Sequence, residues 1–457
     1  MSSSVNCIDW TVVSGRQTEQ TPLLKHLQGV NWGVASFLLV NAALGAGMLN
    51  YPYAYGQVGG VLAAAIIQMV LLVFVASTMF ILIYCSDLNN DDTYHDVLMS
   101  MCGKRAQQLS AASIMLTCFG INITFLVIIG DQYDRLFESL LPEHEGSWYL
   151  DRRFIIGITA LLFILPMCYA RRLDCLRYAS TLGIFAMLYV AFLTVYEFYI
   201  LDENTMIDKG PIKTSPDDWL SLVTVIPVMC FAYQTHEVII PVYACLRQRN
   251  MANFMKATIL GLVILFFLYN VVGAYGYLTF GSNVNPDITL LYDGTDPVVV
   301  IGIIALVIKI ITTYPPLLFC GRGALDGLYA EFRQMSPNKF AETETKRRVI
   351  ITSIWFILTV VLALYAPNIS ITIQLLGSLA SVNVFVFPGM CLISLTKRLR
   401  RAKVGYLSLD SPCDRPLVPE RGISALNALL LQAFAWILIG FGFFIFVIEI
   451  INVFGIA

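Results

Sequence analysis

Charge is scarce in this chain. Only 13% of its 457 residues are Asp, Glu, Lys or Arg, whereas soluble proteins contain about 25%. Hydrophobic residues make up 57% of the chain. The formal net charge of −2 offers no basic surface for nucleic acid. This composition excludes an ordinary soluble domain and predicts an all-α polytopic membrane protein in contact with the lipid bilayer.

The chain also lacks the motifs on which enzymes and metal proteins depend. Its 11 Cys form no CxxC pair and show no zinc-ligand spacing. No phosphate-binding loop and no paired nucleophile and base are visible. Most of the cysteines lie within apolar runs, so we interpret them as small buried side chains and not as disulfide partners. We therefore expect neither an enzyme nor an organic cofactor.

The first 32 residues lack a secretory signal peptide, because no basic start, short apolar core and small-residue cleavage site follow one another. We expect the first apolar segment to act as its own insertion signal. A membrane helix needs about 20 apolar residues, and eleven segments of this chain qualify. Their predicted ranges are 33–55, 60–84, 107–138, 153–170, 176–200, 219–244, 254–280, 296–320, 348–366, 370–396 and 424–453.

The distribution of Lys and Arg predicts the orientation in the membrane. With a cytoplasmic N-terminus, the cytoplasmic segments carry 23 Lys and Arg and the opposite side carries 5. Positively charged connections remain in the cytoplasm. We therefore expect the N-terminus inside and the C-terminus on the lumenal or extracellular side.

Two of the eleven segments are poorly suited to an unbroken helix. The first contains Asn41, Gly45, Gly47 and Pro52, and the sixth is polar from Tyr233 to Glu237. Glycine costs about 1 kcal/mol and proline about 3 kcal/mol in a helix interior. An unpaired backbone group in hydrocarbon costs several kcal/mol, so a broken membrane helix persists only where it lines a protein cavity. Such broken helices bind substrate and ion in many secondary transporters.

The two interrupted segments are five apart. This separation is expected of a 5+5 inverted repeat with the eleventh helix appended. The predicted organisation is a cytoplasmic tail, a first repeat, an external loop, a second repeat, a basic cytoplasmic loop and a last helix. The corresponding ranges are 1–32, 33–200, 201–218, 219–396, 397–423 and 424–457.

The break in the first segment suits an amino acid zwitterion. The N-terminus of a half-helix offers free N–H groups and a positive dipole end to a carboxylate. Unwound carbonyls can accept hydrogen bonds from an ammonium group. Gly45, Ala46 and Gly47 are the candidate carboxylate site, because glycine lets a ligand approach the backbone. The competing interpretation is that the glycines only let two helices pack closely.

The eighth segment supplies a candidate ion site. Thr313 precedes two prolines, and with Asn41 it is a plausible ligand for Na⁺, although Thr often bonds back to its own helix. Lys309 lies one turn earlier on the same face. A charge this deep in the membrane is a functional hypothesis by default. Lys309 is a candidate coupling residue, either as a fixed positive charge or as a titrating group; the alternatives are snorkelling to the outer interface and pairing with Glu237.

Several motifs together resemble a known family. They are Val40-Asn-Ala-x-Leu-Gly-Ala-Gly-x-Leu-Asn-x-Pro52, Ile128-Ile-Gly-Asp-Gln132, Trp148-Tyr-x-Asp-Arg-x-Phe154, Phe231-x-x-Gln-x-His236, Thr312-x-Tyr-Pro315 and Phe319-Cys-Gly-Arg322. Over about residues 33–455 the chain is similar to the sodium-coupled neutral amino acid transporters of the amino acid/auxin permease group, in particular to its lysosomal glutamine and asparagine branch.

The resemblance implies a LeuT-like fold and a symporter of small neutral amino acids, with glutamine or asparagine as substrate and Na⁺ or H⁺ as coupling ion. It assigns Asn41 and Thr313 to the sodium site, while Lys309 departs from the family pattern. The substrate-site candidates in the sixth segment are Phe231, Tyr233, Gln234 and His236. His236 is equally interpretable as a proton sensor or a structural residue. The alternative function is an amino-acid sensor that signals through cytoplasmic segments.

Two sorting patterns favour a lysosomal or endosomal membrane. Glu19-Gln-Thr-Pro-Leu23-Leu24 has the acidic-dileucine form, and Tyr406-Leu-Ser-Leu409 has the tyrosine-based form. Both lie on the predicted cytoplasmic side, where sorting adaptors would bind. We expect a monomer that exports its substrate from the lysosome lumen to the cytosol; the plasma membrane is the alternative location.

Overall fold

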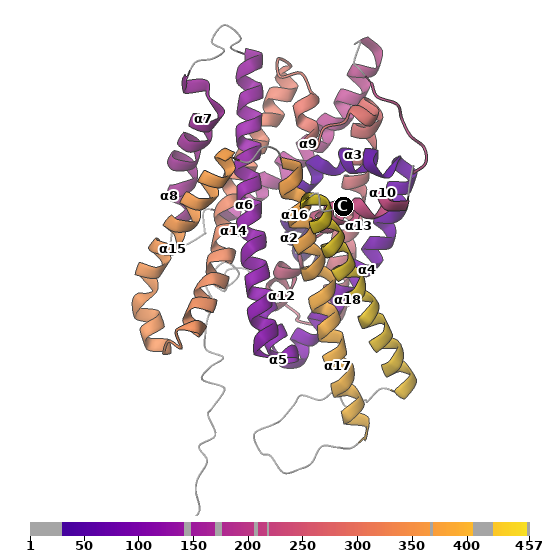
Figure 1. The fold of residues 1–457 in the computed structure, drawn as a ribbon, viewed down its shortest axis with the longest axis vertical. Coiled ribbons are helices and arrows are strands. Elements are labelled where there is room, and N and C mark those ends of the chain that lie inside the picture. Colours follow the sequence, from indigo (N-terminus) through magenta and orange to yellow (C-terminus); the bar gives the residue numbers. More distant parts are fainter. Residues whose placement is uncertain are drawn as a thin grey trace, which may run out of the picture.

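The computed structural model describes residues 30–140, 148–169, 176–204, 209–216, 219–365, 369–404 and 424–454. These residues form an all-helical bundle (Figure 1). The longer helices are α2 (Trp32–Ala43), α3 (Ala46–Val58), α4 (Val61–Asn89), α5 (Tyr94–Cys102), α6 (Lys104–Leu140), α9 (Leu176–Asn204), α13 (Met251–Phe280), α14 (Pro297–Phe332), α15 (Pro337–Tyr365), α16 (Ile369–Ser381), α17 (Phe387–Val404) and α18 (Ala425–Phe454). The shorter ones are α7 (Arg152–Thr159), α8 (Leu165–Cys168), α10 (Trp219–Thr224), α11 (Ile226–Ala232) and α12 (His236–Ala244).

Nine helices among the described residues are long and apolar enough to cross a membrane, or ten if α2 and α3 are one bent span. The prediction of a polytopic all-α protein is confirmed, whereas the count of eleven spans stays a prediction. The expected span at 153–170 is α7 and α8, separated by a π-helical turn over Ala160–Ile164. The backbone stays helical through this turn, so Arg152–Cys168 is one continuous run, slightly shorter than the about 20 residues of a membrane helix.

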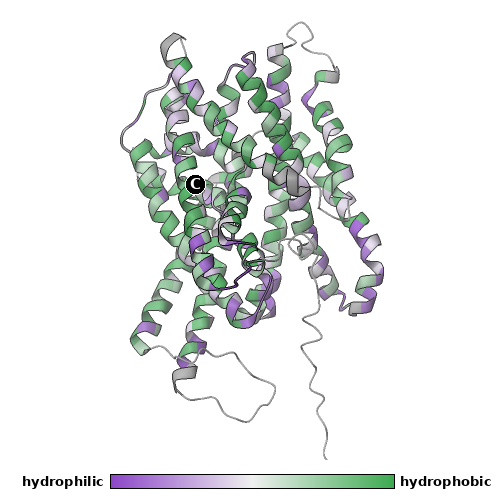
Figure 2. Cartoon of the chain, turned by 180° about the vertical axis from the view of Figure 1, so that it is seen from behind, coloured by the Kyte–Doolittle hydropathy of each residue, from purple (hydrophilic) through white to green (hydrophobic). Residues whose placement is uncertain are grey.

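The outer surface of the bundle is apolar. Figure 2 shows hydrophobic residues over its middle and hydrophilic ones toward its ends. Leu62, Val73 and Phe267 are 71%, 68% and 63% exposed, as expected for side chains that face lipid. The interior holds tyrosines instead, and Tyr51, Tyr55, Tyr233 and Tyr269 are fully buried. Hydroxyl groups therefore lie inside the apolar middle of the bundle.

Helices α14 and α15 extend well beyond the apolar segments that predicted them. The connection expected over 321–348 is helical except for residues 333–336, because α14 ends at Phe332 and α15 begins at Pro337. A two-point ion pair joins them: Arg347 donates to Asp326 with N–O distances of 2.6 and 3.0 Å. Hydropathy marks only the part of a helix that lies inside lipid. It therefore predicts a loop where α14 and α15 continue as polar helix.

Candidate functional site

The first span breaks where its glycines predict. Helix α2 ends at Ala43 and α3 begins at Ala46, and the two are bent by 65° (Figure 1). The Leu44 N–H still bonds the Val40 carbonyl at 2.9 Å, but the Leu44 backbone is extended, so the chain leaves the helix at Leu44. The first N–H groups of α3 have no carbonyl of their own helix to bond. They form the positive end of a 13-residue helix inside the bundle.

The sixth span breaks in the same manner. Helix α11 ends at Ala232 and α12 begins at His236, with Tyr233, Gln234 and Thr235 between them. The polar stretch predicted from Tyr233 to Glu237 is thus the break itself and the first turn of α12.

One tyrosine on α13 joins the two breaks. The hydroxyl of Tyr269 lies 2.9 Å from the Ala43 carbonyl, at the end of α2, and 3.0 Å from the Ala232 carbonyl, at the end of α11. Its ring stacks on Tyr51 at 4.6 Å and meets the edge of Tyr233 at 5.1 Å. The two breaks therefore lie side by side. The single Tyr269 hydroxyl is within hydrogen-bonding distance of one carbonyl from each.

A buried polar network surrounds this junction. Gln68 on α4 donates to the Tyr233 hydroxyl at 2.5 Å and accepts from the Asn270 amide at 2.9 Å. Tyr55 donates to the Asn270 side chain at 2.7 Å. Sequence reasoning missed Tyr269, Gln68 and Asn270. Polar side chains in the middle of otherwise apolar spans were the signal available in the sequence.

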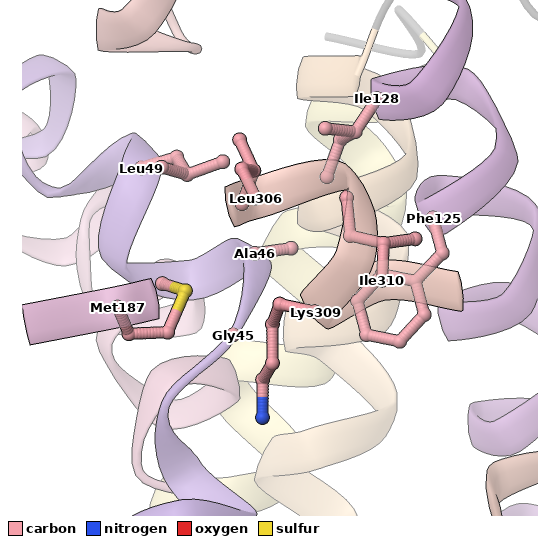
Figure 3. A pocket seen from close by; sticks show the side chains of 9 residues that line it. All are labelled: Gly45, Ala46, Leu49, Phe125, Ile128, Met187, Leu306, Lys309 and Ile310. Atoms are coloured by element: carbon pink, nitrogen blue, oxygen red, sulfur yellow. The ribbon is translucent and has the colours of Figure 1, made fainter. Parts of the chain in front are cut away.

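A small cavity opens beside the first break (Figure 3). Its lining is apolar apart from one lysine: Gly45, Ala46, Leu49, Phe125, Ile128, Met187, Leu306, Lys309 and Ile310. It has room for about one water molecule. An amino acid fits there only if the surrounding side chains move.

The two glycines of the break have different surroundings. A Cβ added at Gly47 would lie 2.9 Å from the Cα and Cβ atoms of Ala232, so α3 packs directly on α11. A Cβ added at Gly45 would meet no heavy atom within 4 Å. The helix-packing interpretation therefore describes Gly47, and the open space for a ligand lies at Gly45.

Lys309 reaches the last turn of α2, next to the break. It is 3% exposed, and its Nζ atom donates to the Asn41 Oδ1 atom at 3.2 Å. The Thr313 hydroxyl donates to the Lys309 carbonyl at 2.7 Å, back to its own helix. Of the two residues proposed for sodium, Asn41 thus has an ammonium group as its neighbour, and Thr313 keeps only its hydroxyl lone pairs for an ion.

The candidate substrate residues of the sixth span are all buried. His236 has its Nε2 atom 3.0 Å from the Thr78 hydroxyl, while its Nδ1 atom has no hydrogen-bond partner. Gln234 is 8% exposed, donates to the Glu237 carboxylate at 3.4 Å, and has an unpartnered Oε1 atom. Phe231 is 9% exposed at the end of α11. The Gln234 Oε1 and His236 Nδ1 atoms are therefore buried without a hydrogen-bond partner.

Other residues singled out in the sequence lie elsewhere. Asp131 accepts two hydrogen bonds from Arg152, at 2.7 and 3.0 Å, and lies within α6, which continues to Leu140. The sorting residues Glu19, Leu23, Leu24, Tyr406 and Leu409 are outside the described residues.

Comparison with known proteins identifies the family. The profile described as "Transmembrane amino acid transporter protein" matches residues 28–405. The chain belongs to the transmembrane amino acid transporter family. It is 38% identical over 362 residues to human "Sodium-coupled neutral amino acid transporter 7", covering 79% of this chain and 78% of that protein. It is 33% identical over 365 residues to human "Solute carrier family 38 member 8", covering 79% and 84% of the two chains.

Two solved structures share the fold of this family member. A crystal structure of MhsT in complex with L-phenylalanine gives a TM-score of 0.54 at 12% identity, covering 92% of this chain and 99% of that one. A substrate-bound, outward-open Na⁺-coupled sialic acid symporter gives 0.53 at 11% identity, covering 94% and 92%. The predicted LeuT-like fold and the expected resemblance are therefore confirmed. The relatives are transporters, so the prediction that the chain is not an enzyme is confirmed as well.

Proposed function

We propose that this amino acid transporter is a secondary active carrier of small neutral amino acids, with glutamine and asparagine as preferred substrates. The observation that carries the proposal is the pair of adjacent helix breaks joined by Tyr269. One break presents N–H groups for a carboxylate, and the other presents polar side chains for the rest of the ligand. The relative named as a sodium-coupled neutral amino acid transporter supports the same substrate class.

The substrate site in this proposal combines both breaks. The N-terminus of α3, at Gly45, Ala46 and Gly47, binds the carboxylate. The break in the sixth span, from Phe231 to His236, binds the ammonium group and side chain, with Tyr233 and Gln234 facing the ligand. A side-chain amide such as that of glutamine has both a donor and an acceptor. The unpartnered Gln234 Oε1 and His236 Nδ1 atoms match a ligand of this kind.

The coupling ion is Na⁺ or H⁺. With Na⁺ as the ion, Asn41 and Thr313 would be its ligands; with H⁺, the site would need no sodium. Lys309 is the proposed coupling residue in both cases. Eleven spans, with the N-terminus in the cytoplasm and the C-terminus in the lumen, complete the proposed topology. In a lysosomal or endosomal membrane a monomer with this topology would export its substrate to the cytosol.

The test is uptake of labelled glutamine into proteoliposomes with an imposed Na⁺ or pH gradient. We expect saturable accumulation that follows one of the gradients. The variant Gln234→Ala should raise the KM about tenfold, because a hydrogen bond to the ligand is lost. Gln248→Ala is the matched control, since Gln248 is exposed at the end of the sixth span.

Two results would overturn the proposal. Saturable glutamine binding without flux would indicate the amino-acid sensor instead. Flux that neither saturates nor accumulates against a gradient would indicate a channel. An equal KM for Gln234→Ala and Gln248→Ala would remove Gln234 from the site.

A further inference from the structure

Lys309 is a buried cation without an anionic partner. Its position is the middle of α14, at 3% exposure, and the Asn41 amide oxygen is 3.2 Å from its Nζ atom. Within the part of the chain that the structure describes, no carboxylate oxygen lies within 4.0 Å of this atom. Both alternatives for Lys309 are therefore absent here: it neither snorkels to an interface nor pairs with Glu237.

The space for this side chain is built into a neighbouring helix. Gly183 on α9 faces Lys309, and a Cβ there would lie 2.5 Å from the Cδ atom and 3.1 Å from Nζ. A larger residue at position 183 would require the outer part of the Lys309 side chain to shift. The Lys309 side chain thus lies along Gly183, bonds Asn41 at its end and lines the cavity with Gly45 and Ala46, as Figure 3 shows for the cavity residues.

A sodium ion at Asn41 would compete with this ammonium group. An ion ligated by the Asn41 oxygen would lie within about 4 Å of Nζ, where two unit positive charges repel by about 4 kcal/mol at an effective dielectric constant of about 20. The hydroxyls of Thr312 and Thr313 both donate to carbonyls of their own helix. The space beside the Asn41 oxygen therefore already contains one positive charge, the Lys309 ammonium group.

We propose that the Lys309 ammonium is the resident cation of this transporter, in the place where a sodium ion would otherwise lie beside the carboxylate of the substrate. The inference rests on the proposed function, because it is the neutral amino acid that brings the negative charge to Lys309. Asn41 positions the ammonium by one hydrogen bond, and the carboxylate at the N-terminus of α3 supplies the missing counter-charge. Substrate binding at this site consequently needs no Na⁺, and a proton gradient is left to drive accumulation.

The deciding experiment measures glutamine uptake in proteoliposomes in which Na⁺ is replaced by a large organic cation. The wild-type chain should transport equally well in both media. The variant Lys309→Thr removes the resident cation and adds an oxygen ligand. Its uptake should be lower than that of the wild type without Na⁺, and Na⁺ should raise it about tenfold. Lys256→Thr removes a lysine that is exposed on α13, and it should behave like the wild type.

Wild-type uptake that depends strongly on Na⁺ would overturn the inference and leave the proposed function intact. So would Na⁺-independent uptake in both the wild type and Lys309→Thr. Absence of glutamine uptake by the wild type under every gradient would overturn the proposed function and the inference together. If Lys309→Thr does not fold, the variant Lys309→Met, which keeps the volume without charge or oxygen, should lose affinity for glutamine; unchanged affinity would overturn the inference.

Discussion

At the scale of single residues, two glycines of one motif have separate roles. Gly47 is a packing glycine, because Ala232 of the sixth span occupies the place of any side chain there. Gly45 has open space at its Cβ position and lines the cavity. The spacing of the motif predicts a break but does not distinguish the two, since both glycines are equally unfavourable in a helix.

The variant Gly47→Ala should lower the stability of the protein. The new Cβ would lie 2.9 Å from backbone and side-chain carbon of Ala232, so α3 and α11 must separate. Overpacking of this kind costs about 1 to 3 kcal/mol. Thermal unfolding of the detergent-purified protein measures the loss. Gly45→Ala is the control: it should unfold like the wild type but have a higher KM for substrate. Equal stability of both variants would contradict the assignment.

At the scale of elements, a short backbone pairing ties the two broken spans together. Just before α2, the Val30 N–H donates to the Cys245 carbonyl at 3.1 Å, and the Arg247 N–H donates to the Val30 carbonyl at 2.9 Å. Residues 245–247 follow directly after α12. The start of the first span and the end of the sixth are therefore joined at one end of the bundle, and Tyr269 joins the same two spans at their breaks.

We predict that Val30→Pro slows transport by about fivefold. Proline removes the N–H that bonds Cys245, at a cost of about 1 kcal/mol. The two broken spans would then move less as one unit during the transport cycle. The maximal uptake rate, normalised to the amount of protein in the membrane, is the measurement. Val30→Ala keeps both backbone bonds and should match the wild type. A rate for Val30→Pro equal to that of Val30→Ala would show that the pairing has no part in transport.

At the scale of the whole molecule, both ends of the bundle contain buried carboxyl groups. Burial raises the pKa of Asp287, between α13 and α14, to about 6, against hydrogen bonds from the Thr289 side chain and N–H. Asp131 raises this pKa further and Arg135 lowers it. Burial likewise raises the pKa of Asp91, between α4 and α5, to about 6.

These shifts predict that the protein is more stable at pH 5 than at pH 7. A carboxyl whose pKa is higher in the folded than in the unfolded state binds more protons when folded, so stability falls as the pH rises from about 4 to about 6. The variant Asp287→Asn should remove about 1 kcal/mol of the difference between pH 5 and pH 7. Melting temperatures at the two pH values measure it.

The control for this prediction is Asp293→Asn. Hydrogen bonds from Thr295 lower the pKa of Asp293, so this group stays charged throughout the range. The variant should keep the wild-type difference between pH 5 and pH 7. An Asp287→Asn variant with the full wild-type difference would show that Asp287 does not titrate in this range.

The sequence alone determined that the chain crosses a membrane many times and that its first and sixth spans break. Both properties are local: hydropathy over about 20 residues marks a span, and Gly, Pro and polar side chains within that window mark a break. The family resemblance rested on the same motifs. The positions of Gly45, Tyr233 and Gln234 in the breaks followed from these signals.

Only the tertiary structure decided which groups meet. Tyr269 and Asn270 are polar side chains in a largely apolar span, but the sequence does not indicate that Tyr269 bonds Ala43 and Ala232. Lys309 and Asn41 are 268 residues apart, and their contact depends on the rotation of α14 and on the space at Gly183. Helix rotation is set by packing against neighbouring helices and not by local propensity. The sequence of the first span predicts a cation site at Asn41. Only the fold shows that the Lys309 ammonium group already lies beside Asn41.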